Sequence, residues 1–169
     1  AFTSAPDFEN PLDAGADNTY VVYVTISDGT NTGTMIQYTI SVTDKSEFDI
    51  GVTTDANAAS DTISEGAVDD AEVGITASAT DGDSGDTVTY AMQTNTTACD
   101  GWFDIGSSDG IVRVDGSSEL DFETVSACVV YVTSTSSDTT TSSKEFTITL
   151  TDVNEHDVSA PTDTDTDDN

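Results

Sequence analysis

Hydrophobic and polar residues alternate along this chain in short runs, and turns rich in Gly, Asp and Ser separate the runs. The run Ile148-Thr149-Leu150-Thr151 shows the pattern, with aliphatic residues on one face and threonines on the other. A half-buried β-strand has this period of two. Helical periodicity is absent from the chain. The pattern therefore predicts an all-β fold of short strands joined by tight turns.

The strands that the pattern predicts fall into two sets. They cover residues 19–27, 35–42, 73–79, 87–92, 102–105, 110–114, 128–133 and 145–150, with one further strand expected within 48–61. The strands after residue 48 number about seven in roughly 100 residues, which is the usual size of an immunoglobulin-like β-sandwich. We therefore expect all-β, Greek-key sandwich domains in tandem.

The same pattern recurs over a long period. The string Val21-Val22-Tyr23-Val24-Thr25 returns unchanged as Val129-Val130-Tyr131-Val132-Thr133, 108 positions later. Asp44 and Asp152, each in an acidic turn that follows a strand, have the same separation. A period of this length indicates whole domains in tandem rather than a short-repeat solenoid.

The period divides the chain into three parts. We expect residues 1–47 to be the C-terminal half of a repeat, 48–156 a complete repeat, and 157–169 the start of a third. The chain begins and ends within the pattern, so we expect a piece of a longer protein. Residues 1–47 hold too few strands for an independent sandwich. Their missing strands come either from the same chain or from a neighbouring copy.

Charge narrows the possible partners. The chain has 33 acidic side chains against three basic ones, a net charge of −30, which argues against binding to nucleic acid or to anionic membranes. The carboxylates either solvate the surface or converge on divalent cations, and their recurrence at fixed places favours cations. Apolar residues make up 35% of the chain and are concentrated in the alternating runs, which argues against disorder. No 18-residue apolar run is present, so no membrane span is expected.

Cys99 and Cys128 are the two cysteines of the chain. In an extracellular β-protein we expect them to form a disulfide, with two free thiols as the alternative. A disulfide would in turn indicate an oxidising compartment.

Acidic motifs follow one another in a fixed order along residues 48–156. They are Glu65, the pair Asp81 and Asp83, the pair Asp121 and Glu123, Asp138, and the turn Asp152-Val153-Asn154-Glu155-His156. Calcium takes six to eight oxygen ligands from carboxylates, carbonyls and water. One Asp-x-Asp pair is weak evidence for such a site, whereas several pieces in fixed order over a domain-length period are strong evidence.

In these motifs the chain resembles a cadherin-type domain of the bacterial, multi-repeat kind. That family has an early Glu, an Asp-x-Asp loop, a Leu-Asp-x-Glu motif and a terminal Asp-x-Asn-Asp-Asn-like linker. The matching pieces here are Glu65, Asp81-Gly82-Asp83, Leu120-Asp121-Phe122-Glu123 and Asp152-Val153-Asn154-Glu155-His156. Asp138 resembles the late calcium-binding Asp of the family.

The resemblance implies calcium ions at the junctions between repeats. The ligands of the first junction would be Asp7, Glu9, Asp44, Glu47, Asp81, Asp83 and Asp138. Those of the second would be Glu65, Asp121, Glu123, Asp152, Asn154 and Glu155, completed by an Asp-x-Asp beyond residue 169. The first linker departs from the pattern at Lys45 and Ser46, so we expect it to bind fewer ions or to bind them less tightly.

The sequence thus predicts a calcium-stiffened repeat of a secreted, cell-surface adhesin or fibre stalk. Its expected partners are adjacent repeats and other copies of itself, and an outside glycan or protein ligand is not identified. One alternative is a self-assembling filament or surface-layer subunit that a neighbouring copy completes. Another is a carbohydrate-binding module that uses Trp102. We do not expect an enzyme, because no nucleophile–base set is visible.

Overall fold

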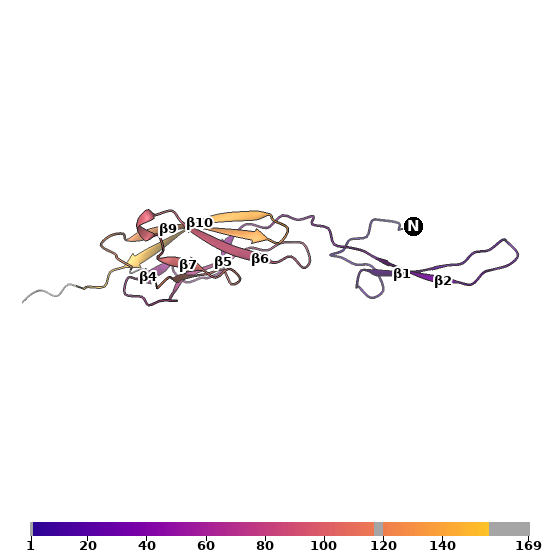
Figure 1. Cartoon of the computed structure of the whole chain (residues 1–169), viewed down its shortest axis with the longest axis horizontal. Coiled ribbons are helices and arrows are strands. Elements are labelled where there is room, and N and C mark those ends of the chain that lie inside the picture. Colours follow the sequence, from indigo (N-terminus) through magenta and orange to yellow (C-terminus); the bar gives the residue numbers. More distant parts are fainter. Residues whose placement is uncertain (1, 117–119, 156–169) are drawn as a thin grey trace, which may run out of the picture.

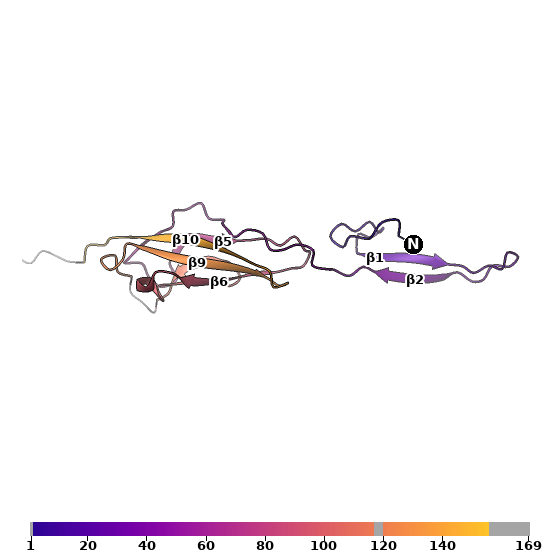
Figure 2. The same ribbon diagram turned by 90° about the horizontal axis from the view of Figure 1, so that it is seen from above.

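The computed structural model describes residues 2–116 and 120–155. They form an eight-stranded β-sandwich and, N-terminal to it, a separate two-stranded hairpin. Figures 1 and 2 show the hairpin and the sandwich end to end, joined by one extended segment. The predicted all-β class is confirmed. The expected third repeat, residues 157–169, lies outside the described part of the chain.

The sandwich consists of two four-stranded sheets, ordered β4-β10-β9-β6 and β3-β5-β8-β7. Its strands are β3 (Thr54–Asp55), β4 (Thr62–Ser64), β5 (Glu72–Ser78), β6 (Val88–Thr94), β7 (Phe103–Ile105), β8 (Ile111–Val114), β9 (Ala127–Ser136) and β10 (Thr141–Thr151). Strand β4 pairs parallel with β10, and the other named pairs are antiparallel. Because the early β4 and the last strand point the same way, the chain enters at one end of the sandwich and leaves at the other (Figure 1). This topology suits domains arranged in tandem.

The core lies between the two sheets and follows the predicted alternation. Its fully buried side chains include Val73, Ile75, Val112, Val130, Val132, Ile148 and Leu150. Strand β5 interrupts its register with β8 between Glu72 and Thr76. Gly74 lies in this bulge at φ +90°, where a Cβ would collide with the carbonyl of Ser60. Glycine is therefore needed at this position.

Strands β9 and β10 extend beyond their predicted limits. The hydrophobic pattern stops at Thr133, yet Ser134 and Ser136 continue the inward face and are buried. The hydroxyl of Ser134 is hydrogen bonded to that of Thr53 at 2.8 Å, which satisfies both groups inside the sandwich. A prediction based on hydrophobicity does not recognise buried serines as inward-facing positions, so it ends the strand too early.

The predicted disulfide is confirmed. Cys99, in a short 3₁₀ turn (Thr97–Cys99), is bonded to Cys128 on β9, and both side chains are fully buried. The bond ties the loop after β6 to the start of β9, an inner strand of its sheet.

The hairpin consists of β1 (Thr19–Val24) and β2 (Ile36–Ser41), paired antiparallel. Large apolar side chains are exposed on both of its faces. A two-stranded hairpin without a packed face is marginal in water. Among the described residues, no helix has the length and apolarity needed to cross a membrane.

The disulfide should contribute measurably to stability. Replacing both cysteines by serine should lower the free energy of unfolding by about 3–4 kcal/mol, since the bond closes a loop with a separation of 29 residues. Urea unfolding followed by the fluorescence of Trp102, the one tryptophan of the chain, measures the difference. An unchanged unfolding midpoint would show that the bond does not constrain the unfolded chain.

Candidate divalent-cation sites

Four carboxylates gather where the segment after the hairpin reaches the sandwich. Each of Glu9, Asp44, Glu47 and Asp83 offers an oxygen within 4.8 Å of the others. Glu9 precedes β1, Asp44 and Glu47 follow β2, and Asp83 lies in the loop between β5 and β6. The group therefore combines ligands from the hairpin side and from the sandwich side.

Asp83 is the centre of this group. Its side chain is buried at 5% exposure, although it carries a carboxylate. It accepts hydrogen bonds from the backbone N–H of Glu47 at 3.2 Å and of Phe48 at 2.9 Å. Its own N–H donates to Asp81 Oδ1 at 3.1 Å. One buried carboxylate thus attaches the linker to the sandwich.

The charges of this group are not balanced by a basic side chain. Among the described residues, the ion pairs with N···O distances within 4.0 Å all involve Arg113, which pairs with Asp109 and Glu72. Two unit charges about 4 Å apart repel by roughly 1 kcal/mol in water and about 4 kcal/mol near a protein surface. Four carboxylates at this spacing repel one another, and a bound cation would relieve that repulsion. An all-oxygen donor set matches calcium or another hard divalent ion.

A second acidic group shares Asp83. Asp81, Asp83 and Asp86 also bring one oxygen each within 4.8 Å of the others. Asp81 Oδ2 is buried and has no hydrogen-bond partner, which is costly for a carboxylate oxygen. A bound cation would supply the missing partner, so the residues fit such an ion. Sequence analysis missed Asp86, although it stands in the same acidic loop.

Gly82 allows the linker to approach this loop. A Cβ at residue 82 would lie 2.8 Å from Cγ of Phe48, closer than real Cβ atoms come to a neighbour. It would also lie 3.1 Å from Cβ of Phe48, and rotation of the Phe48 ring about Cα–Cβ does not relieve that second contact. The Asp81-Gly82-Asp83 motif therefore requires its glycine as well as its two acidic residues.

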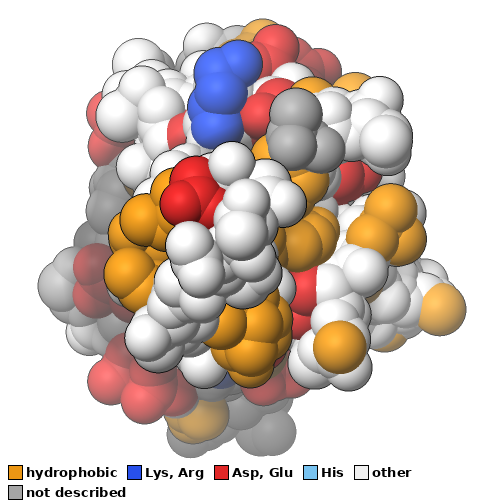
Figure 3. Space-filling model, turned by 90° about the vertical axis from the view of Figure 1, so that its right-hand side faces the viewer, with side chains coloured by type: hydrophobic (Ala, Val, Ile, Leu, Met, Phe, Trp, Pro, Cys, Tyr) orange, Lys and Arg blue, Asp and Glu red, His pale blue; other side chains and the backbone are white. Residues whose placement is uncertain are grey.

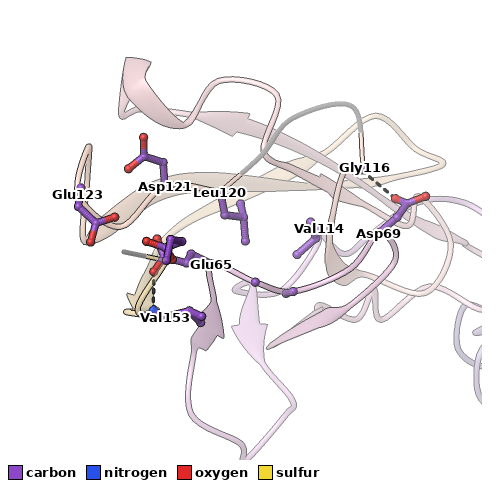
Figure 4. A pocket seen from close by; sticks show the side chains of 11 residues that line it. Glu65, Asp69, Val114, Gly116, Leu120, Asp121, Glu123 and Val153 are labelled. Atoms are coloured by element: carbon purple, nitrogen blue, oxygen red, sulfur yellow. Dashed lines mark hydrogen bonds between the residues drawn. The ribbon is translucent and has the colours of Figure 1, made fainter. Parts of the chain in front are cut away.

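A third group lies at the opposite end of the sandwich. Glu65, Glu123 and Asp152 have oxygens within 4.8 Å of one another. Glu65 accepts a hydrogen bond from the N–H of Phe122 at 2.6 Å and another from that of Val153. Figure 4 shows Glu65 and Glu123 at the edge of an open pocket of about 750 Å³. Glu65 holds the Asp121–Glu123 turn and the exit segment together.

The pKa of Glu65, in this third group, and the pKa of its neighbour Glu155 are shifted in opposite directions. The N–H groups of Val153 and Phe122 lower the pKa of Glu65 by hydrogen bonding to its carboxylate. Partial desolvation raises the pKa of Glu155, and its contact with Glu65 adds to the effect. Two acids that share one place ionise at different pH values. A cation would relieve the repulsion between the neighbouring charges here, as at the first group.

The other predicted ligands lie around these groups. Asp7 accepts the N–H of Asn10, and Asp121 accepts the N–H and hydroxyl of Thr124. Asp121 and Glu155 line the same pocket as Glu65. Asp7, Asp121, Asp138 and Glu155 lie outside the groups of mutually close carboxylates described above, and Asn154 offers an amide oxygen rather than a carboxylate. Their roles as ligands stay predictions.

Ser46 connects the linker to Asp138. Its hydroxyl donates to Asp138 Oδ2 at 2.9 Å, while Thr140 donates to Asp138 Oδ1 from its N–H and hydroxyl. These bonds lower the pKa of Asp138, those from Thr140 most. Ser46 stands where the second linker has Asn154. It contributes a junction contact of its own.

Comparisons with known proteins find similarity in structure only. No protein-family model matches the chain, and no curated protein matches its sequence. The EC1-2 structure of human mucin-like protocadherin superposes with a TM-score of 0.60 at 17% identity, covering 89% of this chain and 74% of that one. The PcdhgB3 EC1-4 structure gives 0.62 at 21% identity, covering 86% and 35%.

Extracellular cadherin domains 1-5 of protocadherin gamma B2 give a TM-score of 0.57 at 23% identity. This chain spans 27% of that structure, and 35% of the protocadherin gammaB7 EC3-6 structure. At these identities the similarity establishes the fold. The chain has a cadherin-like β-sandwich fold.

Gly82→Ala should disturb the first junction directly. The added methyl group displaces Phe48 and weakens the two N–H bonds to Asp83, so the amides of Glu47 and Phe48 should exchange up to about tenfold faster. Hydrogen exchange followed by NMR measures this. Gly66→Ala is the matched control, because a Cβ there lies at an ordinary 3.5 Å from Val153. Equal effects of the two variants at Glu47 and Phe48 would contradict the close approach.

Proposed function

We propose that this chain is a calcium-stiffened repeat of a secreted, cell-surface adhesin or fibre stalk. One observation carries the proposal: Asp83, in the β5–β6 loop, is buried yet lies among carboxylates from the preceding segment. Binding of a cation from both sides of a junction would explain why these carboxylates lie together. The function is then mechanical, namely control of the angle between successive repeats.

At the first junction, Glu9, Asp44 and Glu47 would bind calcium from the hairpin side, and Asp81, Asp83 and Asp86 from the sandwich side. Calcium would supply positive charge where carboxylates otherwise repel. The bonds from Glu47 and Phe48 to Asp83 already orient the linker. The bound ion would then hold the hairpin side against the sandwich.

At the far end, Glu65, Glu123 and Asp152 would form one half of an equivalent site. The other half would come from the next repeat, as the sequence pattern predicts. Asp121, Asn154 and Glu155 remain candidate ligands there, and Asp7 and Asp138 at the first junction. Entry and exit at opposite ends of the sandwich support a linear array of such repeats (Figure 1).

Three features support an extracellular location. The disulfide is buried and fully formed, as is common in proteins that fold in oxidising compartments. Calcium in the range that low-affinity sites require is available outside cells. The fold is the one seen in the extracellular cadherin domains of protocadherin gamma B2.

The carbohydrate-binding alternative has no support in the structure. Trp102 is only 7% exposed and packs in the core, so its ring cannot stack on a sugar. The filament alternative requires that a neighbouring copy covers the hairpin. An adhesin or stalk repeat remains the function that the geometry supports best, without enzymatic activity.

The effect of Asp83→Asn on the melting temperature should change sign when calcium is added. Without calcium, removing one of the clustered charges should leave the melting temperature equal to or above that of the wild type. With calcium, the variant should melt below the wild type because it binds the ion less tightly. Calorimetric titration should give a dissociation constant of about 0.1–1 mM for the wild type.

The control is Asp104→Asn, which neutralises an exposed aspartate on β7 outside the three groups. It should bind calcium as the wild type does. Equal calcium-induced shifts in melting temperature for Asp83→Asn and the wild type would contradict the site.

The rate at which trypsin cleaves the peptide bond after Lys45 should report on the order of the first junction. The chain has three basic residues, of which Arg113 and Lys144 lie within strands and Lys45 lies in the exposed linker. Calcium at ten times its dissociation constant should slow cleavage after Lys45 about tenfold. Mass spectrometry of the fragments over time measures this. A cleavage rate that is the same in calcium and in chelator would argue against an ion that orders the linker.

A further inference from the structure

The β1–β2 hairpin repeats the pairing of β9 and β10 residue by residue. Tyr20 is opposite Ile40, and Val22 is opposite Tyr38. In the sandwich, Cys128 is opposite Ile148, and Val130 is opposite Phe146. Each residue of the hairpin lies 108 positions before its counterpart, on both strands. The two hairpins therefore share register as well as sequence pattern, although one lies in a sandwich and the other does not.

The shared register identifies the two faces of the hairpin. In the sandwich, one face of the β9–β10 pair carries Cys128, Val130, Val132, Phe146 and Ile148, which are buried in the core, and the exposed Lys144, the counterpart of Ile36. The corresponding face of the hairpin consists of apolar and aromatic residues throughout. They are Tyr20, Val22, Val24, Ile36, Tyr38 and Ile40. The opposite face is mixed, with Thr19, Thr39 and Ser41 among its residues.

Exposure alone does not distinguish the two faces. Val22, on the apolar face, is 39% exposed, and its neighbour Val21, on the mixed face, is 47% exposed. Hydrophobic side chains lie at the surface of this end of the molecule (Figure 3). A contiguous apolar surface of this kind is unusual unless something covers it.

The complete sandwich shows what covers such a face. There, β4 pairs parallel with β10, β6 pairs antiparallel with β9, and the β3-β5-β8-β7 sheet packs on the inner side. In the described part of the chain, β1 and β2 have only each other as sheet partners. The hairpin thus needs the equivalents of strands β3 to β8.

A second copy of this chain cannot supply those strands. Its own β3 to β8 already pack against its own β9 and β10. By sequence, residues 157–169 correspond to residues 49–61, which end before β4 begins. Residues 1–47 correspond to the part of the repeat after β8, since Asp7-Phe8-Glu9 matches Asp121-Phe122-Glu123. Neither terminal part of the chain therefore contains equivalents of β4 to β8, and adding further copies does not supply them.

We propose that the apolar face of the hairpin is the core face of a second sandwich, covered by a segment of the same polypeptide that precedes residue 1. That segment is equivalent to residues 48–114 and provides one strand parallel to β2, one antiparallel to β1, and a facing sheet. Because Tyr20 occupies the position of Cys128, this second sandwich lacks the disulfide of the first. The proposal rests on register and is independent of cation binding.

Hydrogen exchange on two chains tests the proposal. One is the chain described here, and the other is the same chain extended by the segment that its own gene encodes before Ala1. In the extended chain, the amides of β1 and β2 should exchange at least about 100-fold more slowly. Amides of β9 should exchange alike in both chains. Equal exchange rates of the β1 and β2 amides in the two chains would overturn the proposal. Protection of these amides in the shorter chain that rises with its concentration would also overturn it, because it would indicate that a second copy covers the hairpin.

Val22→Asp and Val21→Asp in the extended chain form a matched pair. The two residues are adjacent and similarly exposed in the hairpin, but the register places them on opposite faces. Val22→Asp should abolish the protection of β1 and β2 while leaving that of β9 intact, because it places a charge in the second core. Val21→Asp should retain the protection. Loss or retention of protection in both variants alike would overturn the assignment of the faces.

Discussion

The carboxylate of Asp83 has two effects that act in opposite directions. It accepts the N–H groups of Glu47 and Phe48, and so attaches the linker to the sandwich. It is also buried among Glu9, Asp44 and Glu47, whose charges repel it. Without a cation, the hydrogen bonds hold together what the charges drive apart. The proposed calcium ion would remove this conflict, and the order of the junction would then depend on it.

The sandwich is suited to transmit that order along its length. Its parallel β4–β10 pairing places the entry and exit segments at opposite ends, and each end carries an acidic group. Between them lies a packed core with a buried disulfide, which makes the unit stiff compared with the linkers. Bending would then be confined to the junctions, where the proposed ions bind.

Sequence reasoning reached the fold class, the cysteine pair and most of the clustered acids, because each depends on a period or on a motif. It did not reach Asp86, since one more acid in an acidic loop shows no period. It ended β9 early, because Ser134 and Ser136 are polar residues with buried hydroxyl groups. Glu9 and Asp7 looked equivalent in sequence, yet Glu9 lies in the cluster while Asp7 closes a local turn at Asn10. Such distinctions depend on tertiary contacts.

Small-angle X-ray scattering in calcium and in chelator, at matched ionic strength, tests the central claim most directly. If calcium joins the hairpin side to the sandwich, the ion should narrow the distribution of interatomic distances and fix one maximum dimension. Asp83→Asn should remove this response while Asp104→Asn retains it. Scattering curves that are identical in calcium and in chelator for the wild type would contradict the account.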